Sequence, residues 1–248
     1  MRELAAFLAS KGFVAAEEEA TELLTAANGD LRVLQSLVDR RLTGEPLAWI
    51  VGSERFYGLR VLVGSGVYVP RPHSEELVRR AVLRLPRNGT AIDLCTGSGA
   101  LAAALQYHRT DVTVVASDVD ERAVACARAN NVDAHVGDLF DPFENRRVDL
   151  VMGVLPYVPT DKLSLLQRDT FAHESPRSYD GGPGGLDVVK RALRESVRHL
   201  LPGGVVLFEI GAGQLPLLKD EISVFECVQP FFDHEGDIRG FEASLRKM

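Results

Sequence analysis

The chain has 248 residues, of which 46% are hydrophobic and 25% are charged, as is typical of a soluble globular protein with one substantial domain and a smaller one. Its net charge of −7 argues against binding to nucleic acid, which needs clustered Lys and Arg. The three cysteines are widely spaced, so we expect neither a disulfide framework nor a metal site. No segment approaches the ~20 apolar residues of a membrane helix, so we expect a cytoplasmic protein that binds no membrane.

The first part of the chain is predicted to be a helical domain over residues 1–43, followed by a linker over residues 44–72. Apolar residues recur at helical spacing in the domain, and Asp30 is placed to cap its last helix. We expect these helices to recognise the substrate or to close over it. In the linker, strands at 60–63 and 67–69 around a glycine-containing turn predict a β-hairpin.

From residue 73 to residue 248 strands alternate with helices. Ser74 is expected to cap a helix over 75–85. Further helices are predicted at 101–107, 121–130 and 186–200, and strands at 91–94, 112–117, 134–136, 150–154 and 205–210. This alternation predicts an α/β fold with a parallel, doubly wound, Rossmann-like sheet.

Ligand-binding residue types follow three successive strands. A glycine turn from Asp93 to Gly99 lets the backbone approach a ligand closely. Asp118 can accept both hydroxyl hydrogens of a ribose, and Asp138 with Leu139 can hold an adenine edge. Taken singly, Asp118 or Asp120 could instead cap the next helix, and Asp138 could be an ordinary loop acid. Because the carboxyl ends of parallel strands meet at one edge, their combination predicts a nucleotide-type cofactor site.

A dinucleotide-binding dehydrogenase is the alternative use of such a turn. Its fingerprint is G-x-G-x-x-G, whereas Ala102 stands at the last of those places after Gly97 and Gly99. Some dehydrogenases tolerate alanine there, so this departure weakens the alternative without excluding it.

An ordered series of motifs runs through nearly the whole chain. It comprises Arg40-Arg41-x-x-Gly44-Glu45-Pro46, Phe56-Tyr57-Gly58-Leu59, Pro70-Arg71-Pro72-x-Ser74-Glu75, Asp93 to Gly99, Pro156-Tyr157, Asp180-Gly181-Gly182 with Gly185-Leu186, and Glu209-Ile210-Gly211. By this series the chain resembles the HemK-type protein-(glutamine) methyltransferases, which modify peptide-chain release factors. The resemblance implies a seven-stranded class I methyltransferase sheet with a reversed last hairpin, and S-adenosylmethionine as cofactor. The cofactor-binding residues that we expect are Asp93, Thr96, Gly97, Gly99, Asp118, Val119, Asp138, Leu139 and Val154.

The chain departs from this family at its acceptor motif. The family has Asn-Pro-Pro-Tyr where this chain reads Val154-Leu155-Pro156-Tyr157. By resemblance, the Asn oxygen accepts the hydrogens of the acceptor amide and aims its nitrogen at the methyl group. Valine has no acceptor, and a hydrogen bond that positions a nucleophile is worth about 2–4 kcal/mol in the transition state.

Other departures surround the same pocket. They bring aromatic and imidazole groups into it: Tyr68 and Tyr179 replace apolar residues, and His73 replaces an acid. The catalytic candidates are Tyr157, His73, Glu174 and Tyr179. The expected substrate pocket comprises Tyr68, Arg71, Val154, Leu155 and Pro156, since the Pro-Arg-Pro segment walls it in the family.

Three functions are compatible with these features. A HemK-like methyltransferase acting on carbon or nitrogen of a small aromatic or heteroaromatic molecule of specialised metabolism is favoured, with no metal required. The alternative is methylation of a glutamine amide in a protein. The third possibility is a protein that binds S-adenosylmethionine without catalysis.

Overall fold

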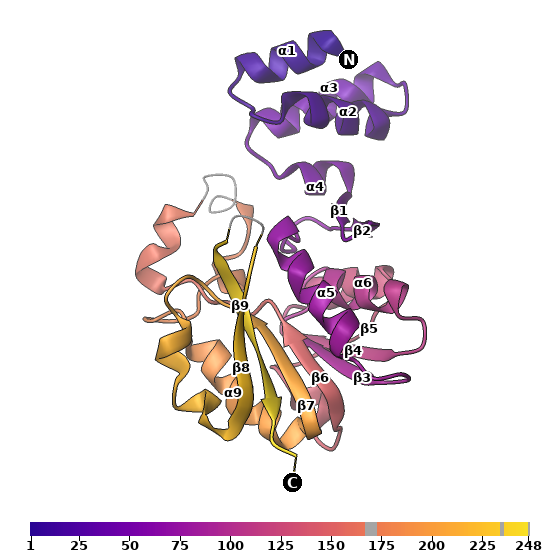
Figure 1. Cartoon of the computed structure of the whole chain (residues 1–248). Helices are drawn as coiled ribbons and strands as arrows, with labels where there is room; N and C mark the ends of the chain where they lie inside the picture. The colour runs from indigo at the N-terminus through magenta and orange to yellow at the C-terminus, as the bar shows by residue number, and fades with distance from the viewer. Residues whose placement is uncertain (167–172, 234–235, 248) are drawn as a thin grey trace.

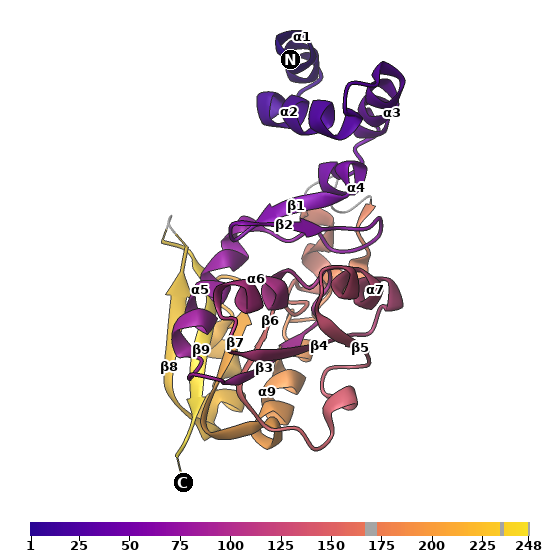
Figure 2. The same ribbon diagram turned by 90° about the vertical axis from the view of Figure 1, so that its right-hand side faces the viewer.

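The computed structural model describes residues 1–166, 173–233 and 236–247. The N-terminal helices stand apart from the sheet, with a hairpin between the two parts (Figures 1 and 2). Helices α1 (Arg2–Ser10), α2 (Ala16–Ala27) and α3 (Leu31–Leu42) share a small apolar core, in which Leu8 and Leu23 are fully buried. The predicted cap is confirmed, because Asp30 accepts hydrogen bonds from the backbone of Arg32 and Val33.

The hairpin forms earlier in the chain than its sequence predicts. Strands β1 (Ser53–Phe56) and β2 (Leu59–Leu62) pair antiparallel, so the predicted strand at 67–69 is wrong. The turn residues Tyr57 and Gly58 have φ of 46° and 80°, the left-handed pair that tight hairpins favour. The segment at 67–69 instead lies against helix α4 (Leu47–Val51), where Trp49 Nε1 donates to the Val67 carbonyl at 2.8 Å.

Within the described residues the main sheet has seven strands in the order β5-β4-β3-β6-β7-β9-β8. These strands are β3 (Thr90–Leu94), β4 (Thr113–Asp118), β5 (Asp133–Val136), β6 (Val148–Gly153), β7 (Leu200–Glu209), β8 (Phe225–Phe232) and β9 (Ile238–Leu245). The first five in this order run parallel, and β9 and β8 run antiparallel to their neighbours. The α/β methyltransferase-type sheet with a reversed last hairpin is therefore confirmed.

Helices cover both faces of the sheet. Helices α5 (Glu75–Arg84), α6 (Ala100–His108) and α7 (Glu121–Ala129) contribute to one apolar core, and α9 (Asp187–His199) contributes to the other. This doubly wound arrangement leaves the carboxyl ends of the parallel strands at a single open edge, where ligands bind in such folds. No helix in the described ranges is long and apolar enough to span a bilayer.

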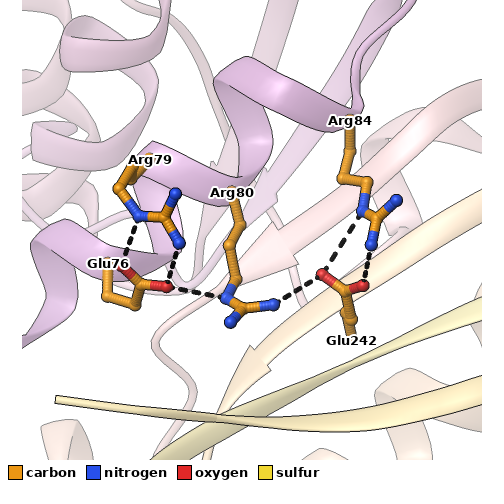
Figure 3. Close-up of polar contacts among 5 residues, drawn as sticks. All are labelled: Glu76, Arg79, Arg80, Arg84 and Glu242. Atoms are coloured by element: carbon orange, nitrogen blue, oxygen red, sulfur yellow. Dashed lines mark hydrogen bonds and ion pairs between the residues drawn. The ribbon is translucent and has the colours of Figure 1, made fainter.

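Ion pairs fasten α5 to strand β9 (Figure 3). Glu76 holds Arg79 and Arg80 on the helix, and Arg80 and Arg84 reach across to the nearly buried Glu242 of β9. The contact fixes the helix that follows the Pro-Arg-Pro segment against the sheet.

The predicted cap of α5 is wrong. Ser74 precedes the helix but makes no side-chain capping bond. Its hydroxyl instead donates to the buried carboxylate of Glu209 at 2.7 Å. Ser74 has a helical backbone conformation, because the 3-10 turn Pro72–Ser74 runs directly into α5, so its side chain is not placed to cap the helix. The buried carboxylate of Glu209 needs a donor and takes the hydroxyl instead.

Candidate active site

A cleft opens at the carboxyl ends of the parallel strands. Of the predicted cofactor residues, Asp93, Thr96, Gly97, Asp118, Val119, Asp138 and Val154 line it. Two others lie behind its wall. Gly99 begins α6 and packs near Ala127, while Leu139 is buried and its carbonyl accepts from Ser117 Oγ at 2.6 Å. The structure thus brings the strand-end groups of the prediction together at one edge.

The carboxylates of Asp118 and Asp120 have different hydrogen-bond partners. One Asp118 oxygen accepts the Gly97 amide at 2.9 Å, and the other accepts the Asp120 amide at 2.9 Å. Burial raises the pKa of Asp118, and these backbone bonds oppose the shift. Asp120 performs the helix-capping role, since it accepts from the Arg122 amide at the start of α7. Asp120 also lines the cleft, but the Arg122 guanidinium engages its carboxylate. Of these two carboxylates, Asp118 is therefore the better placed to bind a ligand.

Gly97 leaves the floor of the cleft open. Its φ is +56°, and the nearest atom to an added Cβ is Tyr68 Cβ at 3.8 Å. A carboxylate beside bare backbone is what a ribose with an adjoining amino-acid chain requires, so these residues fit S-adenosylmethionine. Among the described residues no cluster of three His, Cys, Asp or Glu is arranged to hold a metal ion.

Asp138 is already paired across the cleft. Its carboxylate forms an ion pair with Arg191 of α9, which also lines the cleft. Arg177 lines it from a 3-10 turn, Pro176–Ser178. The sequence prediction missed both arginines, because neither belongs to a motif and only the folded chain brings them to the strand ends.

Asp93 lies beneath the turn, where Thr96 Oγ1 donates to it at 2.6 Å. Burial is the main cause that raises its pKa to about 7, and the Thr96 bond opposes the rise. An acid whose pKa is raised by folding keeps its proton to a higher pH in the native state than in the unfolded state. The stability that Asp93 contributes therefore falls as pH rises from about 4 to about 7.

Asp93→Asn is expected to remove this pH dependence. The free energy of unfolding of the variant relative to the parent should rise with pH by up to about 1.4 kcal/mol per unit, then level above pH 7. Urea unfolding at pH 5, 6, 7 and 8 measures it. The control is Asp111→Asn, because Arg109 lowers the pKa of the exposed Asp111, which places its dependence below this range. A flat difference for Asp93→Asn would contradict the assignment.

A second pocket adjoins the cleft. Tyr68, Val154 and Ser178 line both cavities. The second pocket is lined by Tyr68, Arg71, Pro72, His73, Val154, Leu155, Tyr157, Val158, Leu166, Ser178 and Tyr179. It contains the predicted acceptor residues except Pro156, which faces the first cleft, and Glu174, which lines neither. Val154, with Tyr68 and Ser178, therefore stands where the two cavities meet.

Glu174 supports the wall of the second pocket from behind. It is buried, forms a 2.8 Å ion pair with Arg71, and accepts a hydrogen bond from the Tyr179 hydroxyl. The Tyr179 ring meets Tyr68 edge-on, with centroids 5.6 Å apart, and the Arg71 guanidinium lies 5.4 Å from the Tyr68 ring centre. These contacts make a rigid aromatic wall, in which the carboxylate of Glu174 already has donors.

Two tyrosines of the pocket are held as phenols. Burial raises the pKa of Tyr68 and of Tyr157, and the charge of Glu209 adds to both shifts. The Tyr157 hydroxyl donates to Glu209 Oε1 at 2.7 Å. At neutral pH these rings provide surface and donors, and neither accepts a proton as a base.

Glu209 is the residue that the sequence prediction missed at this site. It appeared only within the motif Glu209-Ile210-Gly211, although an acid that ends a parallel strand is a signal in itself. The structure buries it completely and surrounds it with Tyr157, His73 and Ser74.

The seven-stranded sheet with a reversed last hairpin and a cleft at its strand ends is the architecture of S-adenosylmethionine-dependent methyltransferases. The family model for the "Methyltransferase small domain" matches residues 74–201. The chain belongs to the HemK-type family of release factor glutamine methyltransferases, since it is 36% identical to such an enzyme of Thermodesulfovibrio yellowstonii over 75% of this chain and 71% of that one.

The chain is also similar to a second named enzyme and to a solved structure. The 4-amino-L-phenylalanine/4-methylamino-L-phenylalanine methyltransferase of Streptomyces pristinaespiralis is 37% identical over 72% of this chain and 65% of that one. The solved structure of a methyltransferase from Pyrococcus furiosus superposes with a TM-score of 0.57 at 19% identity, over 90% of this chain and all of that one. The second similarity concerns the fold alone.

Proposed function

We propose that this enzyme methylates a small aromatic or heteroaromatic molecule of specialised metabolism, at nitrogen or carbon. The observation that carries the proposal is Val154, an apolar side chain at the junction of the two cavities. An amide acceptor needs a hydrogen-bond acceptor at this point, whereas an aromatic acceptor needs a surface to pack on. The relative named for 4-amino-L-phenylalanine supports an aromatic amine as the first acceptor to test.

In this proposal the residues of the chain position the methyl donor and the acceptor. S-adenosylmethionine supplies a methyl group already activated on a sulfonium sulfur. Asp118 and the open backbone at Gly97 would hold this donor, while Tyr68 and Tyr179 would hold the acceptor ring by edge and face contacts. Alignment of this kind and exclusion of water account for much of the rate of such displacements.

The N-terminal helices are proposed to act on the acceptor side. Helix α4 contacts residues beside the cavities through Trp49, whose ring meets His173 edge-on with centroids 6.4 Å apart and whose Nε1 donates to the carbonyl of Val67, a residue that lines the cleft. Movement of the helices can therefore be transmitted to the segment that carries Glu174, as a lid or a recognition element requires.

A protein glutamine amide is the second candidate acceptor. Similar proteins named for release factor and for ribosomal protein uL3 glutamine methylation favour it. In that case a backbone carbonyl near Leu155 would accept the amide hydrogens that the Asn of the family accepts. Binding of S-adenosylmethionine with no methylated product from either acceptor class would instead support the third possibility, a protein without catalysis.

Val154→Asn tests the choice between acceptors. With 4-amino-L-phenylalanine, kcat/KM is expected to fall about tenfold or more, because an amide in the apolar wall costs roughly 1–3 kcal/mol to desolvate. Val154→Ala is the matched control, which removes volume without adding polarity. Methyl transfer is measured as S-adenosylhomocysteine formed, with a glutamine-bearing release factor assayed in parallel. Methylation of the release factor, with aromatic amines inert and Val154→Asn faster than the parent, would overturn the proposal.

A further inference from the structure

We infer that Glu209 is a positioning residue, which holds His73 with a free Nδ1 toward the acceptor. The part that concerns the acceptor rests on the proposed function. The part that concerns the geometry of His73 does not, and the two are tested separately below.

Three side chains from two segments converge on this carboxylate. Glu209 ends β7, and its side chain is 1% exposed. Its Oε1 lies 2.7 Å from the Tyr157 hydroxyl and 3.1 Å from His73 Nε2, and its Oε2 lies 2.7 Å from Ser74 Oγ. His73 and Tyr157 line the acceptor pocket, whereas Ser74 lines the donor cleft. A single buried group thus contacts residues that line both cavities.

The hydrogen-bond pattern selects one form of the histidine. An ionised carboxylate only accepts, so each of its three neighbours must donate to it. Tyr157 is available as a donor because it stays a phenol, its pKa being raised by burial and by the Glu209 charge. His73 must then carry its hydrogen on Nε2, which leaves the lone pair of the neutral ring on Nδ1.

This arrangement provides a route for the proton that methylation of an amine releases. The nitrogen lone pair forms the new N–C bond while the methyl–sulfur bond breaks and its electrons stay on sulfur. The methylated nitrogen then carries one surplus proton. His73 Nδ1 can take that proton and pass it to water, since the His73 side chain is 29% exposed while Glu209 is buried.

Nitrogen-15 labelling of histidine in the whole chain tests the geometry without any acceptor. Long-range proton–nitrogen spectra distinguish the two neutral forms, and His73→Ala identifies the signal. We expect the Nε2–H form in the parent and a loss of that preference in Glu209→Gln, whose side-chain amide can present a donor to the ring. A parent His73 that is mainly Nδ1–H, or an even mixture, would overturn the inference even if Glu209→Gln does not fold.

A double-mutant cycle tests the catalytic consequence with 4-amino-L-phenylalanine. Glu209→Gln is expected to lower kcat about 10- to 100-fold, as loss of an orienting partner typically does, while the affinity for S-adenosylhomocysteine changes less than about threefold. The double variant Glu209→Gln, His73→Ala should be no slower than His73→Ala alone. Losses that multiply would show a merely structural carboxylate and refute the positioning role. If the amine is inert in the parent, the proposed function fails and the spectra still decide the inference.

Discussion

Asp118→Ala is expected to weaken binding of S-adenosylmethionine by about 100-fold or more. The carboxylate is the strand-end group that faces the cleft, and hydrogen bonds to a charged group are worth roughly 1.5–3 kcal/mol each. The substitution also removes the acceptor of the Gly97 amide, so the glycine turn at the floor of the cleft loses a hydrogen bond that holds it in place. Calorimetric titration with S-adenosylhomocysteine measures the loss and needs no methyl acceptor.

Asp120→Asn is the matched control for this effect. It removes one carboxylate from the same loop while retaining a residue that caps α7. We expect its affinity to stay within about threefold to fivefold of the parent's, because Asp120 lines the cleft but is already engaged by the amide and guanidinium of Arg122. Equal losses for the two variants would show that the net charge of the loop, rather than the position of Asp118, binds the ligand.

Gly99→Ala is expected to destabilise the fold by about 2–4 kcal/mol. Gly99 has φ of +78°, and an added Cβ would lie 2.9 Å from Ala127 Cβ and 3.0 Å from Val132 Cγ2. Both neighbours belong to the buried core, so relief requires α6 to move away from α7. Urea unfolding followed by circular dichroism gives the free energy.

Gly97→Ala separates packing from backbone strain. Its φ is also positive, at +56°, but an added Cβ would meet nothing closer than 3.8 Å. The expected cost is therefore about 1–2 kcal/mol, from the left-handed conformation alone. A cost for Gly99→Ala as small as that for Gly97→Ala would disprove the close packing of α6 against α7.

Local features of this chain can be predicted from its sequence, whereas contacts between distant segments cannot. Alternating strands and helices, the turn at Gly97 and the strand-end place of Asp118 follow from short patterns, and all three appear in the structure. The hairpin was misplaced, because Tyr57 adopts a left-handed conformation that its residue type does not indicate. Ser74 was misassigned because its partner Glu209 lies 135 residues further along the chain.

By itself, the sequence determined the class of sheet, the donor edge and the absence of a hydrogen-bond acceptor at Val154. The class of sheet follows from the periodicity of apolar residues along the chain, and the other two features follow from the chemistry of single side chains, which folding does not change. Only the tertiary structure decided that Val154 separates two cavities, that Glu174 is paired with Arg71, and that Glu209 gathers His73, Ser74 and Tyr157. Such groupings arise when segments distant in sequence meet in a buried place, where each polar group must find a partner.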